Sequence, residues 1–261
     1  MARLSGQVAV ITGANSGIGL ATAKRFVEEG AHVVITGRRK KELDEAAEQI
    51  GKNVTAIQGD VSRSEDLDRL YAEVKARHGH IDILFANAGV GQVAPLGAIT
   101  EEHFDREFDI NVKGLLFSVQ KALPLLRDGG SIILNSSIAG RKGIEGFSVY
   151  NASKAAVRSF ARSWTSDLKG RKIRVNAISP GPIETPIFGK MGMSQEQFRE
   201  FATSIVSQLP LGDPRTGSTH RLFDPLDWIH AVTAHIPERG RHCVRYYVTQ
   251  RFTWSWAREA L

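Results

Sequence analysis

The sequence contains very little cysteine, since Cys243 is the only one among its 261 residues. A lone thiol excludes an intrachain disulfide and a metal cluster built on several cysteines, and it is typical of a reducing compartment, so we expect a cytoplasmic protein. Long apolar runs are also missing. No stretch approaches the roughly 18 apolar residues of a membrane span, and residues 1–6 lack the apolar core of a signal peptide. We therefore expect no membrane partner.

A dense cluster of charge of one sign is absent too. The net charge is only +6, from 34 Lys and Arg against 28 Asp and Glu, and the basic residues are dispersed. No aromatic residues interleave them as an RNA-binding face would require, so we expect no nucleic-acid partner. No His, Cys and carboxylate cluster has metal-ligand spacing, so we expect no metal. A mildly basic surface that attracts small anions is the simpler interpretation.

Short β-branched runs alternate with helical patterns through the first 180 residues. The predicted strands are residues 8–11, 32–36, 54–58, 81–86, 132–135 and 174–178. The predicted helices are residues 20–29, 40–50, 67–77 and 104–119, with one more that Tyr150 opens. This alternation predicts an α/β fold with one doubly wound parallel sheet and helices on both faces. Ligands are expected at the carboxyl ends of the strands.

A glycine-rich turn with Gly13, Gly17 and Gly19 separates the first strand from the first helix. Glycine permits a tight turn, and a helix N-terminus offers free N–H groups to a dinucleotide phosphate. After the second strand, Gly37 stands where an NAD site normally has a carboxylate, and Arg38 follows. A guanidinium suits a 2′-phosphate, so NADP(H) is favoured over NAD(H). A solvated basic turn remains the alternative.

Tyr150 and Lys154 are four residues apart, which places both side chains on one helix face. A nearby ammonium favours phenolate, so we expect the pKa of the tyrosine to be lowered toward neutrality. Ser137 follows an apolar strand and would offer its hydroxyl to a substrate oxygen in the same cleft. Taken alone, a tyrosine and a lysine at this spacing also occur by chance.

The motifs Thr-Gly-x-x-x-Gly-Ile-Gly, Asn87-Ala88-Gly89, Asn111, Ser137, Tyr150-x-x-x-Lys154 and Pro180-Gly181 occur in this order, and the chain resembles the short-chain dehydrogenase/reductase family from residue 1 to about 211. The resemblance implies a Rossmann-like fold, a homotetramer and hydride transfer between NADP(H) and a carbonyl or secondary alcohol. It makes Tyr150 the general acid/base, assisted by Lys154, Ser137 and Asn111. Ser137 and Tyr150 would bind the substrate. A helix kink at Asn111 would hold a water that links to Lys154.

The resemblance also implies the residues that contact the cofactor, with Asp60 accepting from the adenine amino group and a substrate lid at residues 187–201. The cofactor residues are Gly13, Ser16, Gly17, Ile18, Gly19, Arg38, Asp60, Val61, Asn87, Ala88, Gly89, Tyr150, Lys154, Pro180, Gly181, Ile183 and Thr185. The substrate itself is left open, from sugars to steroids, acyl thioesters and small ketones.

Lysine and methionine are absent from residues 212–261, which hold seven Arg, four His and three of the four Trp. We divide the chain into a cofactor-binding and catalytic domain at 1–211 and an atypical C-terminal segment of the same domain at 212–261. A frameshift explains such a change of composition, and a divergent C-terminus is the alternative. A damaged tail would put the tetramer in doubt. It also keeps a second function open, that of a catalytically impaired NADP(H) sensor or scaffold.

Overall fold

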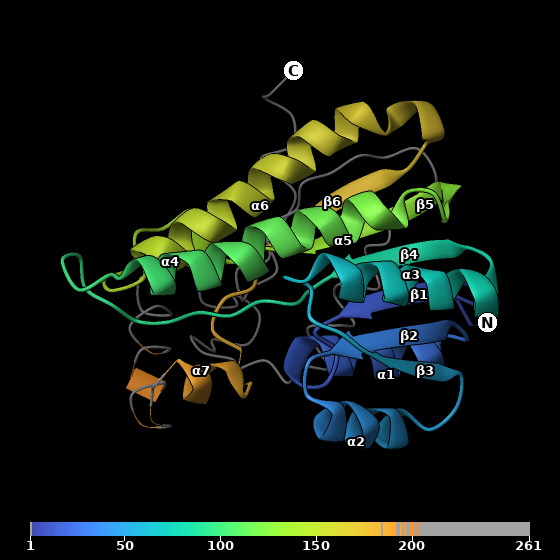
Figure 1. Ribbon diagram of the computed structural model, residues 1–261, viewed down its shortest axis with the longest axis horizontal. Coiled ribbons are helices and arrows are strands. Elements are labelled where there is room, and N and C mark those ends of the chain that lie inside the picture. Colours follow the sequence, from blue (N-terminus) through green and yellow to red (C-terminus); the bar gives the residue numbers. More distant parts are fainter. Residues whose placement is uncertain are drawn as a thin grey trace, which may run out of the picture.

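The structure, a computed structural model, describes residues 2–183, 185–191, 194, 196, 199, 200 and 203. The expectations for the segment 212–261 and for part of the lid lie outside these residues and stay predictions. Strands and helices alternate along the described chain (Figure 1), as the sequence pattern predicts. Within the described residues, no helix has both the length and the apolar character to cross a membrane.

Six parallel strands form one sheet in the order β3-β2-β1-β4-β5-β6. Their bounds are β1 Val8–Thr12, β2 His32–Gly37, β3 Val54–Gln58, β4 Ile81–Ala86, β5 Leu126–Asn135 and β6 Arg174–Ile178. The order reverses between β1 and β4, so the crevice for a ligand opens there, at the carboxyl ends of the strands. The predicted α/β doubly wound fold is confirmed.

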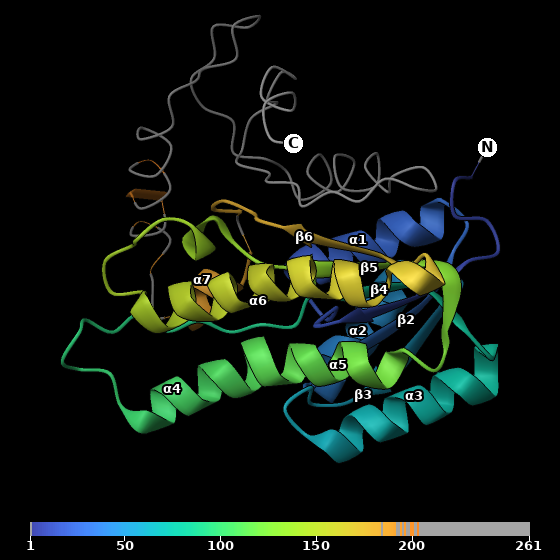
Figure 2. The same ribbon diagram turned by 90° about the horizontal axis from the view of Figure 1, so that it is seen from above.

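Helices cover both faces of the sheet, because neighbouring residues of each strand point to opposite sides. Val10 and Val34 pack with α3 (Ser64–His78), α5 (Leu115–Ala122) and α6 (Ser148–Asp167) on the side that faces the viewer in Figure 1. Figure 2 shows these three helices together on one side of the sheet. Ile11 and Ile35 pack with α1 (Gly17–Glu28) and α2 (Lys40–Ile50) on the other.

The helix predicted at residues 104–119 is not a single α-helix. It consists of α4 (Glu101–Phe108), a π-helical segment (Asp109–Gly114) and then α5. Thr100 caps α4, since its side-chain oxygen accepts from the backbone N of His103. Single π-turns inside α-helices are frequent at functional sites, and this π-helical segment contains Asn111.

Strand β5 is longer than predicted, because it begins at Leu126 instead of residue 132. Its register against β4 shifts between the pairs Ile81–Leu126 and Ile83–Ser131. The intervening residues 127–130 include Gly129 in the left-handed region at φ 80°. This polar, glycine-containing stretch lacks the apolar pattern of a strand, which is why the sequence predicts only the second half.

Candidate active site

One cavity of about 540 Å³ lies at the carboxyl ends of the strands. Nearly all of the predicted site residues line it. They are Gly13, Ser16, Gly17, Ile18, Arg38, Asp60, Val61, Asn87, Ala88, Gly89, Ser137, Tyr150, Lys154, Pro180, Gly181, Ile183 and Thr185. The cavity thus brings together residues as far apart in the chain as Gly13 and Thr185. Gly19 and Asn111 do not line it, and both act on residues that do.

The glycine-rich turn packs tightly against the end of β4. Gly13 has φ +65°, and a Cβ there would lie 2.7 Å from Ala88 Cα. A Cβ at Gly19 would lie 2.5 Å from Gly13 O and 2.6 Å from Asn87 Nδ2. Asn87 Nδ2 in turn donates to the backbone oxygens of Thr12 and Gly13, at 2.9 and 3.1 Å. Only glycine fits at these two positions, and the α1 N-terminus behind the turn is left open toward the cavity.

The end of β2 presents a guanidinium to the cavity and no carboxylate of its own. Gly37 is the last residue of β2, and a Cβ there would lie 3.1 Å from Asn15 Oδ1. The Arg38 side chain is 44% exposed, and its Nη1 lies 3.6 Å from Asp60 Oδ2. Asp60 also accepts from the backbone N and the Oγ of Ser62, at 3.0 and 2.7 Å. The ion pair with Asp60 is long and partly exposed, so Arg38 remains able to bind an anion.

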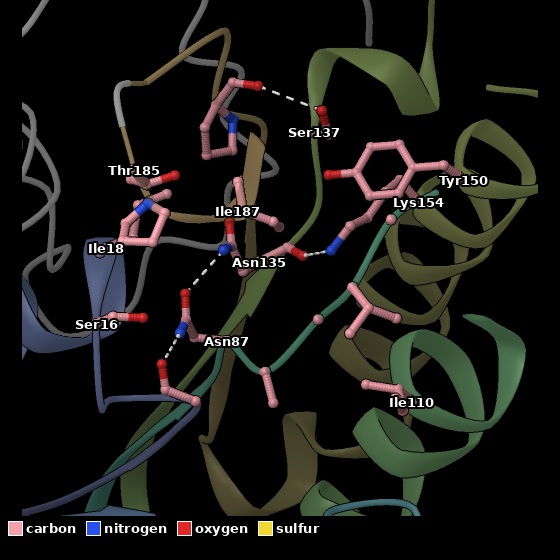
Figure 3. A pocket seen from close by; sticks show the side chains of 18 of the residues that line it. Ser16, Ile18, Asn87, Ile110, Asn135, Ser137, Tyr150, Lys154, Thr185 and Ile187 are labelled. Atoms are coloured by element: carbon pink, nitrogen blue, oxygen red, sulfur yellow. Dashed lines mark hydrogen bonds between the residues drawn. The ribbon is translucent and has the colours of Figure 1, made fainter. Parts of the chain in front are cut away.

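Tyr150 and Lys154 come from the first two turns of α6 and face the cavity together with Ser137 (Figure 3). Lys154 is only 4% exposed, and its Nζ donates to the backbone oxygen of Asn135 at 2.9 Å. Asn135 Nδ2 donates to Asn87 Oδ1 at 2.8 Å. The dashed lines of Figure 3 follow this chain from the lysine to the glycine-rich turn. Asn135 is not among the predicted site residues, although it ends the strand that precedes Ser137.

The expected pKa of Tyr150 is wrong in direction for this structure. Burial raises the pKa of Tyr150 to about 12, while a hydrogen bond with Ser137 acts the other way. Lys154 Nζ lies 5.6 Å from the centre of the tyrosine ring and donates its hydrogen bond to Asn135. Burial also lowers the pKa of Lys154 to about 8. Desolvation therefore outweighs the hydrogen bond with Ser137, and the phenol is protonated at neutral pH.

Asn111 is fully buried, and its amide has the partners that a buried amide needs. Its Oδ1 accepts from Val90 N at 2.8 Å, and its Nδ2 donates to Val90 O at 2.8 Å and to Ser153 Oγ at 3.1 Å. A Cβ on Gly89 would lie 3.2 Å from Asn111 Oδ1 and 3.3 Å from Lys154 Nζ. Asn111 therefore holds the loop after β4 next to the lysine. The water link to Lys154 stays a prediction.

The side of the cavity around Tyr150 is mainly apolar. Its ring packs edge-on against Phe147, with centres 6.1 Å apart and planes at 70°. Ile144, Ile187 and Met191 also line the cavity. Ile187 and Met191 belong to the lid predicted at residues 187–201, whereas Ile144 was not predicted. Ser136, the alternative to Ser137, is 3% exposed and donates to Lys154 O at 2.8 Å, so its hydroxyl is already engaged. Within the described residues, no group of three His, Cys, Asp or Glu side chains could hold a metal.

Comparison with known proteins agrees with this geometry. A family profile described as short chain dehydrogenase matches residues 7–196. Oxidoreductase asL5 of Sarocladium schorii is 50% identical over 202 residues, which is 77% of this chain and 81% of that protein. Hydroxynaphthalene reductase-like protein Arp2 of Metarhizium brunneum is 37% identical over 224 residues, covering 80% of this chain and 83% of that protein.

A solved structure with the same fold is the 3-ketoacyl-(acyl-carrier-protein) reductase from Brucella melitensis complexed with NADH. It is 33% identical, has a TM-score of 0.75, and the match covers 88% of this chain and 90% of that one.

Proposed function

The chain belongs to the short-chain dehydrogenase/reductase family, and from that premise we propose that it is an NADP(H)-dependent carbonyl reductase. Membership makes it an oxidoreductase that acts on a CH–OH or C=O group with a nicotinamide cofactor. The proposal adds three things: the choice of NADP(H), the roles of the site residues, and reduction as the favoured direction.

The cavity suits a nicotinamide dinucleotide. Gly13 and Gly19 have no side chain, so the backbone packs closely at both positions. Backbone N–H groups and the α1 N-terminus can therefore approach the ligand, as a pyrophosphate requires. Ser16, Gly17 and Ile18 would hold the pyrophosphate there. Arg38 would bind the 2′-phosphate, because Gly37 removes the carboxylate that would repel it.

Asp60 and Val61 line the cavity and would lie at its adenine end, and Asn87, Ala88 and Gly89 would lie beneath the nicotinamide half. Pro180, Gly181, Ile183 and Thr185 line the wall after β6 and would contact the nicotinamide. When bound, NADPH supplies the hydride that adds to the carbonyl carbon.

Tyr150 serves as the general acid in this proposal. Its phenol, with a pKa of about 12, keeps its proton at neutral pH and can donate it to the carbonyl oxygen as negative charge develops there. The Ser137 hydroxyl lies within hydrogen-bond reach of the same phenol and would donate to the same substrate oxygen. A protonated resting phenol favours reduction, because oxidation of an alcohol needs a phenolate as base.

Lys154 would hold the nicotinamide ribose and stabilise negative charge on Tyr150. Its Nζ is positioned by Asn135 O, and the pKa of about 8 leaves it mostly charged at neutral pH. Asn111 would take part in the proton supply, and it would also hold Val90 in place.

One observation carries the proposal: Ser137, Tyr150 and Lys154 open into the same cavity as the glycine-rich turn and Arg38. A cofactor sensor or scaffold would need the turn and Arg38 but not the triad. This juxtaposition therefore supports turnover over the alternative of binding alone.

The apolar surroundings of Tyr150 favour an uncharged substrate with a ring or a long apolar part. The test is consumption of NADPH and of NADH, followed by the absorbance of the reduced nicotinamide, with aromatic bicyclic ketones, simple cyclic ketones and a 3-ketoacyl thioester. We expect turnover of an apolar ketone with NADPH preferred. Tight NADPH binding without turnover of any carbonyl would favour the sensor, and a preference for NADH would refute the role of Arg38.

A further inference from the structure

Glu107 is a carboxylate that the chemistry above does not use, yet it is almost completely buried beside the active site. It lies in the last turn of α4 and is 1% exposed, and His103, one turn earlier, is 5% exposed. His103 Nε2 lies 3.7 Å from Glu107 Oε1, beyond hydrogen-bond range. Neither ring nitrogen of His103 nor Glu107 Oε2 has a hydrogen-bond partner among the described residues. Burying a charged or unpaired polar group costs free energy of folding, so a buried carboxylate at this place points to a role in the site.

The partner of Glu107 is the loop that forms one wall of the cavity. Its Oε1 accepts from the backbone N of Gln92 at 2.5 Å. One helical turn further on, Asn111 exchanges two hydrogen bonds with Val90. Glu107 and Asn111 are four residues apart, so they lie on one face of the helix. Their hydrogen bonds hold the loop on either side of Gly91.

Gly91 is the point where this loop meets the catalytic side chain. A Cβ on Gly91 would lie 3.1 and 3.4 Å from two carbons of the Tyr150 ring. The space between Gly91 and the ring is therefore too small for an added methyl group without strain, and any shift of the loop changes the space beside the phenol. Glu107 holds the position of Gly91 through its hydrogen bond with the backbone N of the next residue, Gln92.

The charge of Glu107 also reaches the catalytic pair. The titratable groups near it are His103 on α4 and Lys154 and Tyr150 on α6. Burial raises the pKa of Glu107. The hydrogen bond from the backbone of Gln92 lowers that pKa, and so do the nearby side chains of His103 and Lys154. The Glu107 carboxylate in turn raises the pKa of Lys154 against the effect of burial, and it raises the pKa of Tyr150.

We propose that Glu107 is a positioning residue of this active site: its carboxylate holds the Gly91–Gln92 backbone against Tyr150 and places a buried negative charge within electrostatic reach of Lys154. The inference rests on the proposed function, because Tyr150 and Lys154 carry the chemistry there. Its two parts can be separated. The hydrogen bond needs an oxygen acceptor at the right distance, and the electrostatic part needs the charge.

Two substitutions separate these parts. Glu107→Gln keeps an acceptor oxygen at the same reach and removes the charge, whereas Glu107→Asp keeps the charge and draws the acceptor back by one methylene. Glu102→Gln is the matched control, because Glu102 lies on the same helix and is exposed. It makes the same change of net charge away from the site. Thermal melts establish that each variant is folded.

The first readout needs no turnover. Protein labelled with ¹³C-lysine is titrated by NMR, and the Lys154 Cε signal is assigned by its loss in Lys154→Met. The wild-type midpoint is expected at about 8. In Glu107→Gln it should fall by roughly half a unit to one unit, since the charge that favours the ammonium is gone. It should stay in place in Glu107→Asp and in Glu102→Gln.

The second readout is kinetic. In Glu107→Asp the KM for the carbonyl substrate should rise about tenfold or more, as expected when a charge-assisted hydrogen bond is lost, while NADPH affinity stays constant. Glu107→Gln should keep its KM within about threefold of wild type. A folded Glu107→Gln protein with an unmoved Lys154 midpoint would overturn the electrostatic part, and an unchanged KM in Glu107→Asp would overturn the positional part. Absence of turnover in the wild type would count against the proposed function alone, because the NMR titration does not depend on it.

Discussion

Around β1 and β4 the cavity depends on glycines, whose lack of a side chain lets backbone segments pack closely. Around β5 and α6 it depends instead on polar side chains that are buried. In the first region, the cofactor half, Gly13 and Gly19 pack so closely that a Cβ would lie within 2.7 Å of a neighbouring backbone atom. In the second, the catalytic half, Lys154 and Asn111 are 4% and 0% exposed, and each is held by hydrogen bonds. Added atoms should therefore damage the first half, and removed atoms the second.

The two halves are joined by a short chain of hydrogen bonds. Lys154 Nζ donates to Asn135 O, Asn135 Nδ2 donates to Asn87 Oδ1, and Asn87 Nδ2 donates to Gly13 O. The catalytic lysine is thus positioned relative to the turn that would hold the pyrophosphate. This arrangement fits a reaction in which the reacting atoms of cofactor and substrate must be held close together in a fixed orientation.

The largest expected effect is in the catalytic half. Tyr150→Phe should lower kcat by about 10²–10⁴-fold and leave the Kd for NADPH nearly unchanged, because it removes the acid and keeps the ring. Steady-state kinetics and calorimetry measure the two quantities. Tyr71→Phe is the control, since Tyr71 donates to Ser118 O in the core away from the cavity. If Tyr150→Phe kept more than about a tenth of the rate, its role as acid would be wrong.

In the cofactor half, Arg38→Gln should weaken NADPH binding by about 10- to 150-fold, as expected for loss of a charge-assisted contact with the 2′-phosphate. NADH binding should change little, because NADH lacks that phosphate. Lys40→Gln makes the same charge change in a side chain that is 61% exposed and paired with Asp44, so it serves as control. Equal losses for NADH and NADPH would show that Arg38 only supports the loop.

Gly19→Ala tests whether added volume is what the cofactor half cannot accept. Overpacking against Gly13 O and Asn87 Nδ2 should cost about 1–3 kcal/mol, seen as a lower melting temperature and as NADPH binding weakened by up to about 150-fold. Gly170→Ala is the matched control, because a Cβ there meets no atom within 4 Å. Normal NADPH affinity and stability in Gly19→Ala would break the contrast between the halves.

The smallest expected effect is a pH dependence from the catalytic half. Burial lowers the pKa of Lys154 to about 8, so its ammonium is lost as the pH rises through that value. The kcat for reduction should be level near neutral pH and fall to about half at pH about 8. The same curve measured with Glu102→Gln should coincide with it. A kcat that rises through this range would show that the deprotonated form of a site residue drives the reaction.

The sequence predicts what depends on local pattern. Strands β3, β4 and β6 have the predicted bounds, and each of their apolar runs is followed directly by a polar or glycine residue. The residues of the glycine-rich turn and of the tyrosine–lysine pair could be identified because their chemistry requires fixed spacing. The family match confirms the family that these motifs predict.

What the sequence could not predict arises from contacts between distant segments. The apolar spacing of residues 104–119 is the same for a continuous α-helix, so the π-helical segment is invisible in it. Lys154 donates to Asn135 on β5, which no helix spacing reveals, and burial by the assembled fold reverses the expected direction of the pKa of Tyr150. Glu107 lies on the same helix as Glu101 and Glu102, which are exposed, and packing of the fold buries Glu107 alone among the three.

The central claim, hydride transfer from NADPH to a carbonyl, is tested most directly by following the transferred atom. The wild-type protein is incubated with NADPH that carries deuterium at C4 of the nicotinamide and with an apolar cyclic ketone, and the alcohol is examined by mass spectrometry and NMR. The account predicts a single deuterium on the carbinol carbon, from one of the two C4 positions only, and almost no product with Tyr150→Phe. Bound NADPH with no alcohol formed, or an alcohol without deuterium on that carbon, would contradict it.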